Sequence, residues 1–529
     1  MHLVERIRHQ RGEVIMQQGA LPFQYEIEGG SSGLTALAGL PVYLELSAVM
    51  GLRKSIEEHV KVRCGRQGWT DSQLLMSLLL LNVAGGDCVE DLRTLEADEG
   101  FGRVLKRSEL WDLSRRERRE MERRWRKERR RVVPSSSATF RYLKKFHDPK
   151  QEVLRRQLEL IPEAPRAFIP APNKALRGLS RVNRDLLAFA AAQGANEVAT
   201  LDTDATISKT TKASARYCYK HVKAYQPLNV WWAEQGLMVH TEFRDGNVPA
   251  GHEQRRVFEE ALSHLPAQVK KVRARSDTAG YQHELLRYLD RGENERFGRI
   301  EFAFSSDVTT EFKKAVAEVP EDAWHKTYRV VHGQTVEADL EWAEVCFVPS
   351  ELAKKRTGLE YRYLATREPM LEQALPGMES QKELPFPTMR MVGAKYKVFG
   401  IVTNMDWEGE RLIRWLHERC GKSEEAHAVL KNDLAGGHFP SQHFGANAAW
   451  WWITVLAHNL NAIMKRHVLR GNWMNKRMKA IRFALINLPG RVLEHARRLV
   501  IRLTQWQPMA RFLLEVRCRI ASLVPVPTG

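Results

Sequence analysis

The stretch that decides the fold is "VATLDTDATIS", Val198–Ser208, a short and half-apolar segment that carries two carboxylates. In a strand, successive side chains point to opposite faces, so Asp202 and Asp204 would share one face. Two neighbouring carboxylates repel each other, and both lose hydration if that face is covered. A positive group is therefore expected in front of them, either an arginine or a metal ion.

The composition is that of a globular protein with a strong basic surplus. The chain has 529 residues, with 82 Lys and Arg against 64 Asp and Glu, which gives a net charge of +18. This length predicts two to four domains. The surplus favours a polyanionic partner, most often nucleic acid; a basic protein without such a partner is the alternative. The six scattered cysteines, with no Cys-x-x-Cys pair, argue against a zinc site and a disulfide framework.

Nothing in the sequence predicts a membrane or secretory segment. The N-terminus has no signal-peptide core, and the most apolar run, Leu74–Ala84, is about half the length of a membrane span. We expect a cytoplasmic protein that could reach DNA freely.

The first 150 residues are predicted to be mainly helical. "SQLLMSLLLLNVAGG" is typical of a buried helix stopped by two glycines, and "VVPSSSATFRYLKKF" carries a helix-start signal. Between them, Arg115–Arg131 holds eleven basic and four acidic residues. We interpret this run as a contact to the DNA backbone through Arg123, Arg124 and Arg126. A solvated helix or a disordered basic arm is the alternative.

From about residue 195 strands and helices alternate, which indicates an α/β core. The expected strands are 198–207, 228–243, 300–307 and 395–405, and the expected helices are 251–265 and 280–291. Residues 312–395 are mixed and strand-like, and 408–434 are helical with a break near Cys420–Gly421.

Two further carboxylates are candidates for the same chemistry. Asp277 follows a strand-like stretch, where a helix cap is the alternative. Glu424 lies on a predicted helix on which Glu424, His427, Ala428 and Lys431 share one face, while Ala426, Val429 and Leu430 face the core. A solvated face is the alternative for Glu424 and Lys431. His427 could contact a phosphate or simply lie beside Glu424.

Three separated carboxylate sites in a basic α/β chain suggest metal chemistry. Magnesium binds carboxylate oxygens, and two such ions can activate an attacking oxygen and stabilise the leaving oxygen of a phosphodiester. We predict that Asp204, Asp277 and Glu424 are catalytic metal ligands for Mg²⁺, with Mn²⁺ as a substitute. Asp202 is the alternate first ligand.

Several segments, in this order, resemble one family. They are "LDTDAT", "YQPLNVWWAEQGLMVHTEFRDGN", "RSDTAGY", "RCGKSEEAHAVLKNDLAGGHFPS", "GANAAWWWITVLAHNL" and "IRFALINLPGRVLEHARRLVIRL". The chain resembles DDE transposases of bacterial insertion sequences, in the branch numbered thirteen-eighty. The resemblance implies an RNase H-like core interrupted by a mainly β insertion between the second Asp and the Glu.

The resemblance also bears on single residues. Related enzymes carry Asp, any residue and Thr at the end of the first strand, which Asp204-Ala205-Thr206 fits and Asp202 does not. On the Glu helix they carry Arg, three residues, Glu, six residues, Lys. Glu424 and Lys431 keep the second spacing, and Arg419 stands one residue further away than the pattern has it. Lys431 and Arg419 are thereby predicted to bind DNA phosphate.

The expected architecture is a multidomain α/β protein. Its predicted parts are a helical DNA-binding region with a basic arm (1–150), the first part of an RNase H-like catalytic core (151–311), a β-rich insertion (312–395), the second part of the core with the Glu helix (396–470) and a basic C-terminal region (471–529). Within them, Trp450–Trp452 are expected to pack in the core. Trp324 and Trp342 are expected to pack within the insertion, with contact to an unstacked base as the alternative.

The predicted function is that of a transposase. It would bind the inverted-repeat ends of its element as double-stranded DNA, cleave them and join them to target DNA, as a homodimer on DNA. The alternatives are a metal-dependent nuclease without strand transfer and a non-enzymatic DNA-binding regulator.

Overall fold

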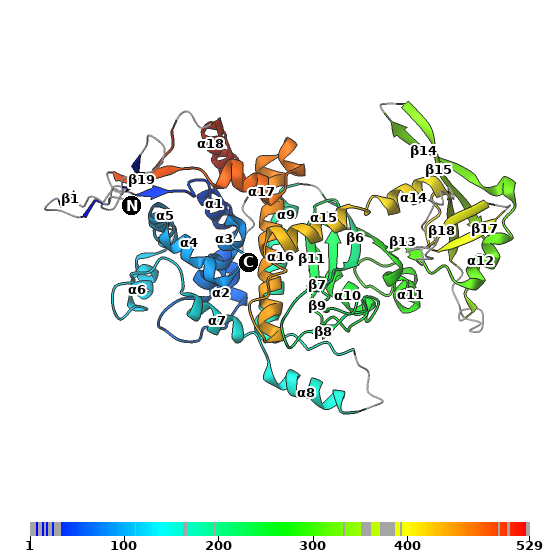
Figure 1. The fold of residues 1–529 in the computed structure, drawn as a ribbon, viewed down its shortest axis with the longest axis horizontal. Coiled ribbons are helices and arrows are strands. Elements are labelled where there is room, and N and C mark those ends of the chain that lie inside the picture. Colours follow the sequence, from blue (N-terminus) through cyan, green and yellow to red (C-terminus); the bar gives the residue numbers. More distant parts are fainter. Residues whose placement is uncertain are drawn as a thin grey trace.

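The computed structural model of the protein describes most of the chain. The described residues are 33–111, 113–161, 167–194, 196–331, 334–350, 361–370, 387–391, 394–495, 498–504 and 508–524, with four two-residue strands, β1 to β4, at Ile7–Arg8, Glu13–Val14, Gln17–Gln18 and Gln24–Tyr25. Parts of the expected N-terminal region and insertion, including 351–360 and 371–386, lie outside them. The molecule is elongated, with helices at one end, a sheet in the middle and a β-rich lobe at the other end (Figure 1).

A large mixed sheet forms the centre of the molecule, in the strand order β11-β10-β6-β12-β13-β18-β16-β15-β14, with β17 paired to β18. The first five strands are β11 (Leu237–Glu242), β10 (Leu228–Trp232), β6 (Val198–Ala205), β12 (Lys271–Ser276) and β13 (Glu301–Ser306). β10 runs antiparallel to β6 and β11, whereas β12 runs parallel to β6 and β13. The expected mixed α/β fold is confirmed.

Helices cover this sheet because its strands are apolar on both faces. All five residues of β10, "LNVWW", are buried, as expected for a strand inside a covered sheet. The helices against it are α9 (Lys174–Ala192), α10 (Gln254–His264), α11 (His283–Arg291) and α16 (Phe444–Ile463). Trp450, Trp451 and Trp452 on α16 are all buried, so their predicted packing role is confirmed.

The β-rich lobe continues the central sheet. Its strands are β14 (His325–Val331), β15 (Gln334–Val345), β16 (Arg362–Pro369), β17 (Thr388–Met391) and β18 (Ala394–Thr403). Thr403 on β18 is in register with both Ala303 and Arg362, so this strand joins the lobe to β13. Trp324 and Trp342 are each 8% exposed. Arg367 of the lobe lies over the Trp324 ring, and Trp342 packs in a cluster that β13 and α14 (Gly409–His417) share with the lobe. Both therefore have the expected packing role.

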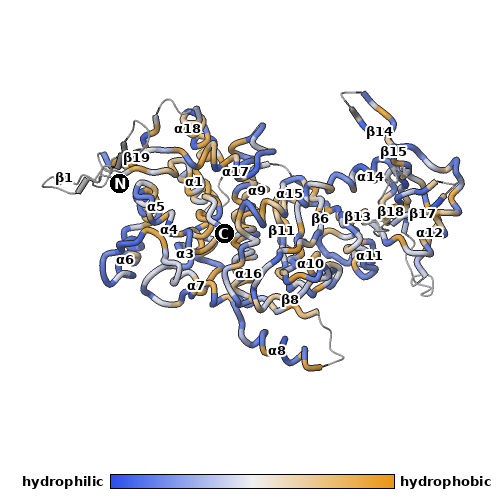
Figure 2. The backbone as a smooth tube through the Cα atoms, viewed as in Figure 1, coloured by the Kyte–Doolittle hydropathy of each residue, from blue (hydrophilic) through white to orange (hydrophobic). Residues whose placement is uncertain are grey.

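Eight helices of residues 41–159 precede the sheet. They are α1 (Pro41–Val49), α2 (Leu52–His59), α3 (Asp71–Ala84), α4 (Leu92–Ala97), α5 (Glu99–Glu109), α6 (Arg115–Arg123), α7 (Ser136–Lys144) and α8 (Pro149–Glu159). α3 ends at Gly85, whose φ of 102° is left-handed, as the glycine stop predicts. α7 begins after Ser135, whose side chain accepts a hydrogen bond from the Ala138 amide, as its start signal predicts. Figure 2 shows that α6 is more hydrophilic in sequence than α3.

The C-terminal residues fold back onto these helices. Strands β19 (Gly490–His495) and β20 (Arg498–Arg502) form a small sheet with β5 (Leu34–Thr35). Two more helices, α17 (Met478–Ile481) and α18 (Pro508–Ala521), lie nearby (Figure 1). The region expected at 471–529 is therefore packed against the region expected at 1–150, and the domain boundaries themselves stay a prediction.

Within the described residues, no single helix is both long and apolar enough to cross a bilayer. Only the pair α3 and Val89–Ala97 reaches that length jointly, and it is bent by 94°.

Candidate active site

Two of the predicted acids lie side by side because their strands are neighbours. β6 and β12 are parallel, and the register pairs Thr203 with Ser276. Asp204 follows Thr203 and Asp277 follows Ser276, so the two acids stand at the same end of neighbouring segments. Paired strands are about 4.8 Å apart. Asp277 also caps a short 3-10 helix, since its Oδ1 accepts a hydrogen bond of 3.1 Å from the Ala279 amide. The helix-cap interpretation therefore holds for this residue, and its role as a metal ligand stays a prediction.

The third acid comes from the helical segment that follows the β-rich lobe. This segment divides into α14 (Gly409–His417) and α15 (Lys422–Ala428), and the break at Cys420–Gly421 is where the sequence predicts it. Figure 1 shows the two helices running from the lobe toward α16. Glu424 is exposed in the first turn of α15, and its Oε2 lies 3.3 Å from the Ser423 hydroxyl.

The three acids are electrostatically linked through Asp204. Burial is the main cause that raises the pKa of Asp204 to about 6, and the charge of Asp277 is the next. The charge of Glu424 acts in the same direction, whereas Arg419 and Ser423 lower the pKa. Asp204 therefore carries negative charge that its protein surroundings do not fully compensate.

The three carboxylates fit a hard divalent cation by their chemistry, since such ions prefer carboxylate oxygens. A bound cation would also remove the repulsion recorded in the raised pKa of Asp204. In the parts of the chain that the structure describes, no three His, Cys, Asp or Glu side chains are already arranged to hold a metal ion. Coordination by these acids thus requires some of their side chains to move.

Asp202 has a different environment, although it shares a face with Asp204. Its two oxygens accept hydrogen bonds of 2.6 and 2.9 Å from Nε and Nη2 of Arg275, the residue in register with it on β12. The same guanidinium donates to the Trp415 carbonyl and lies 4.9 Å from the centre of that indole ring. Asp202 is thus part of a buried connection between the sheet and α14. This pairing favours Asp204 over Asp202 as the metal ligand.

Two predicted basic residues lie close to Asp204. Nη2 of Arg419 is 3.8 Å from Asp204 Oδ2, and Nζ of Lys431 donates to the Ile207 carbonyl at 3.3 Å. Burial and the charge of Lys220 lower the pKa of Lys431, while Asp204 opposes this shift. Lys431 belongs to a π-helical turn, Val429–Asp433, that follows α15. Such turns are frequent at functional sites.

The predicted faces of α15 need a correction. The buried residues are Ser423, His427 and Leu430, whereas Ala426 and Val429 are only partly buried. The sequence pattern placed His427 on the open face because imidazole is polar. In the structure the imidazole is accommodated inside by polar partners.

Those partners form a buried chain of hydrogen bonds. The Trp451 indole N–H donates to Thr241 Oγ1 at 2.9 Å, and the Thr241 hydroxyl donates to Asn229 Oδ1 at 2.6 Å. The Asn229 amide N–H then donates to Nε2 of His427 at 3.1 Å. Nδ1 of His427 lies 3.9 Å from Asp204 Oδ2.

The direction of this chain fixes the tautomer of the imidazole. The Asn229 oxygen faces the Thr241 hydroxyl, so its amide nitrogen faces His427. An amide N–H can only donate, and Nε2 of His427 must therefore accept. The proton of the neutral imidazole is then on Nδ1, on the side of Asp204. Burial is the main cause that lowers the pKa of His427 to about 3, so the ring stays neutral. Sequence reasoning missed Asn229 and Thr241; a signal was the lone amide in the apolar run "LNVWW".

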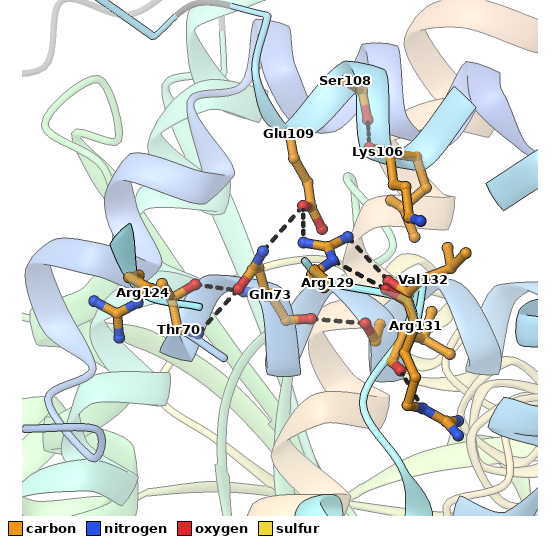
Figure 3. A network of polar contacts seen from close by, with 12 residues as sticks. Thr70, Gln73, Lys106, Ser108, Glu109, Arg124, Arg129, Arg131 and Val132 are labelled. Atoms are coloured by element: carbon orange, nitrogen blue, oxygen red, sulfur yellow. Dashed lines mark hydrogen bonds and ion pairs between the residues drawn. The ribbon is translucent and has the colours of Figure 1, made fainter. Parts of the chain in front are cut away.

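The basic run 115–131 is only partly helical. α6 covers Arg115–Arg123, and the residues after it return onto α3 and α5 (Figure 3). Arg129 donates to Glu109 Oε2 at 2.6 Å, and its guanidinium lies 4.8 Å from the centre of the Trp69 ring. Gln73 donates to the same Glu109 oxygen at 2.9 Å. This half of the run is therefore built into the helical region and is not a free arm.

The three arginines named for DNA binding differ in their surroundings. Arg124 donates to the carbonyls of Gly68 and Gly65 at 3.0 and 3.1 Å, so it holds a loop. Arg123 and Arg126 are exposed. Arg123 and Arg126 remain the predicted phosphate contacts of this run. Arg124 stabilises the loop at Gly65 and Gly68, whether or not it also contacts DNA.

Comparison with known proteins identifies the family. No curated protein sequence matches the chain. Among solved structures, the chain is similar to the piggyBac transposase in a cryo-EM synaptic complex with hairpin DNA, with 10% identity, coverage of 94% of this chain and 89% of that chain, and a TM-score of 0.40. The family described as transposase DDE domain group 1 matches residues 21–525. The chain therefore belongs to the group 1 DDE transposases, which are enzymes that cleave DNA and transfer its strands.

Proposed function

We propose that this protein is the transposase of a bacterial insertion sequence, in the branch numbered thirteen-eighty. It binds the inverted-repeat ends of the element, cleaves them and joins them to target DNA. β6 and β10 to β13 form the RNase H-like core in this proposal, which the order β11-β10-β6-β12-β13 supports. The observation that carries the proposal is the parallel register of β6 and β12, which brings Asp204 and Asp277 to the same end of neighbouring strands. The raised pKa of Asp204, to which burial contributes most and the charges of Asp277 and Glu424 also contribute, supports it.

In this proposal the three acids hold magnesium, and manganese can replace it. The metal, when bound, supplies Lewis acidity for phosphodiester cleavage and strand transfer. Asp204 must be deprotonated to act as a ligand, which a cation favours. Lys431 and Arg419 carry the positive charge that binds a DNA phosphate beside the acids. His427 directs an N–H toward Asp204 and thereby limits the orientations of that carboxylate.

Binding of the element ends is assigned to residues 1–150, with Arg123 and Arg126 on phosphates. Two ends must be processed together, so we propose a homodimer on DNA. The β-rich lobe and the C-terminal strands are the parts proposed to reach the partner subunit, because both lie away from the acids (Figure 1).

The test is a cleavage and joining assay on DNA that carries the element's own ends, with and without Mg²⁺. Asp204→Asn, Asp277→Asn and Glu424→Gln are each expected to abolish nicking and joining and to retain binding of the ends in a gel-shift assay. Glu425→Gln is the matched control, because Glu425 is the exposed neighbour of Glu424 on the same helix and points about 100° away.

Full nicking by the Asp277→Asn or Glu424→Gln protein would overturn the assignment of the acids. Nicking without joining by the unaltered protein would favour a nuclease over a transposase. A second readout is stabilisation of the unaltered protein by Mn²⁺ in thermal unfolding, which each of the three substitutions is expected to reduce.

A further inference from the structure

A small sheet leaves the core directly after Asp204. Its strands are β7 (Ser208–Lys209), β8 (Arg216–Tyr217) and β9 (Lys223–Tyr225), in the order β7-β9-β8. Residues 208–225, here called the basic finger, contain five Lys and Arg and no Asp or Glu. The finger thus places a purely basic element four residues after a proposed metal ligand.

The finger exposes two aromatic rings. The exposed fraction is 63% for Tyr217 and 71% for Tyr219, whereas Cys218 between them is buried. Tyr217 ends β8, and Tyr219 lies on the turn that follows it, so the two rings are exposed on either side of the buried Cys218. Nζ of Lys220 lies 5.6 Å from the Tyr219 ring centre, and Nζ of Lys223 lies 5.9 Å from that of Tyr217.

The tip of the finger has a defined backbone conformation. The His221 amide donates to the Cys218 carbonyl at 2.9 Å, and the Cys218 amide donates to the Val222 carbonyl at 2.9 Å. His221 has a φ of 55°, the left-handed conformation that closes short hairpins. Tyr219 and Lys220 are therefore presented on a closed turn, which lowers the entropy cost of a contact made through them.

The base of the finger is anchored in the core. Tyr225 is fully buried and its hydroxyl accepts a hydrogen bond of 3.1 Å from the Asn447 amide. The Ala213 amide donates to Gln442 at 2.8 Å. Lys220 lies near the site as well, since its charge adds to burial in lowering the pKa of Lys431, on which Asp204 acts in the opposite direction. The exposed rings accordingly belong to an element fixed beside the proposed site.

We propose that the basic finger binds single-stranded DNA next to the cleavage point, with Tyr219 stacked on an unpaired base and Lys220 on a phosphate. The inference rests on the proposed function, because it places the DNA strand at Asp204. The ring and the lysine fit the two parts of a nucleotide, since every base offers a π-face and every phosphate a negative charge. An acidic protein would account for the lysines and leave the two exposed rings unused.

The test uses the full-length protein and an end oligonucleotide that is unpaired over the last few bases and carries 2-aminopurine there. Wild-type protein is expected to quench the 2-aminopurine fluorescence. Tyr219→Leu, which keeps an apolar side chain and loses the π-face, is expected to abolish the quench and to weaken binding of this oligonucleotide by roughly 5- to 150-fold. Tyr219→Phe, the matched control, is expected to behave like wild type. Lys220→Gln is expected to lower the salt slope of binding by about 0.7.

The outcomes separate this inference from the proposed function. An Asp204→Asn protein that cannot nick and still quenches through Tyr219 supports the finger, whatever the chemistry of the acids. A Tyr219→Leu protein that quenches and binds like wild type overturns the finger and leaves the proposed function intact. Equal loss of binding to this oligonucleotide and to a fully paired one also overturns it, because the contact would then not involve an unpaired base.

Discussion

Asp204 is expected to destabilise the metal-free protein at neutral pH, and replacing it by Asn should remove this cost. Its pKa is raised from 3.8 to about 6, chiefly by burial. A carboxyl group with a raised pKa in the folded state holds its proton more tightly there than in the unfolded chain. The stability it provides is therefore present below pH 3.8 and is lost as the pH rises through 6.

The size of the effect follows from the shift. Two pKa units at about 1.36 kcal/mol each give a cost of about 3 kcal/mol at pH 8, of which about 1.6 kcal/mol is already incurred at pH 5. The gain from Asp204→Asn should thus be about 1.4 kcal/mol larger at pH 8 than at pH 5. At about 2–4 °C per kcal/mol for a cooperative unit of roughly 150–250 residues, this is a difference of about 3–6 °C in melting temperature.

The assay is thermal unfolding of both proteins in EDTA at the two pH values. Glu425→Gln is the matched control, since it removes an exposed acid of the same region and should change the melting temperature equally at both pH values. A gain in melting temperature on Asp204→Asn that is the same at pH 5 and pH 8 would refute the reasoning. It would mean that Asp204 does not destabilise the protein through its ionisation.

Four other substitutions have distinct expected results. Asp202→Asn should lower the unfolding free energy by about 3–5 kcal/mol at neutral pH, because it leaves the buried guanidinium of Arg275 uncompensated. A stability gain like the one expected for Asp204→Asn would contradict this. Asn229→Asp should move the His427 proton from Nδ1 to Nε2, as read from ¹⁵N chemical shifts of the imidazole, because a carboxylate accepts and cannot donate; an unchanged tautomer would contradict the direction of the chain. Arg129→Ala should lower the melting temperature measured by calorimetry, because Arg129 binds Glu109 and lies over Trp69. Arg126→Ala should change the unfolding free energy by no more than about 0.5 kcal/mol, because Arg126 is exposed. Equal effects would mean that Arg129 is not built into the helical region.

Local sequence signals predicted the elements of the fold better than their assembly. Gly85 ends one helix and Ser135 begins another, and both effects depend only on residues a few positions away. The run "LNVWW" is apolar enough to predict a strand that is covered on both faces. The sharing of β18 between β13 and the β-rich lobe depends on two long-range pairings, such as Ala303 with Thr403 and Arg362 with Thr403. No local pattern records such a pairing, because a strand has the same sequence whichever neighbour it takes.

The candidate site was predicted residue by residue, whereas its polar surroundings were not. Asp204, Asp277 and Glu424 could be named from their places in or after strands and on a helix, together with the family resemblance, which favoured Asp204 over Asp202 and supported Glu424 by its spacing to Lys431. The sequence could not reveal that His427 points inward. Its burial depends on an amide and a hydroxyl from two other strands, and a helical projection treats a histidine as polar whatever lies opposite it.

The two acids of β6 show why alternation alone leaves the positive partner undecided. Asp202 and Asp204 share a face, yet Arg275 is in register with the first and binds both of its oxygens. Asp277 directly follows β12, which ends at Ser276. Asp204 therefore has an acid as its neighbour, Asp277, whereas Asp202 has the guanidinium of Arg275. Arg419 approaches Asp204 only to 3.8 Å, beyond hydrogen-bond range. The strand therefore provides one carboxylate with an arginine partner and leaves the other without a close one, which is why we propose Asp204 and not Asp202 as the ligand of a cation.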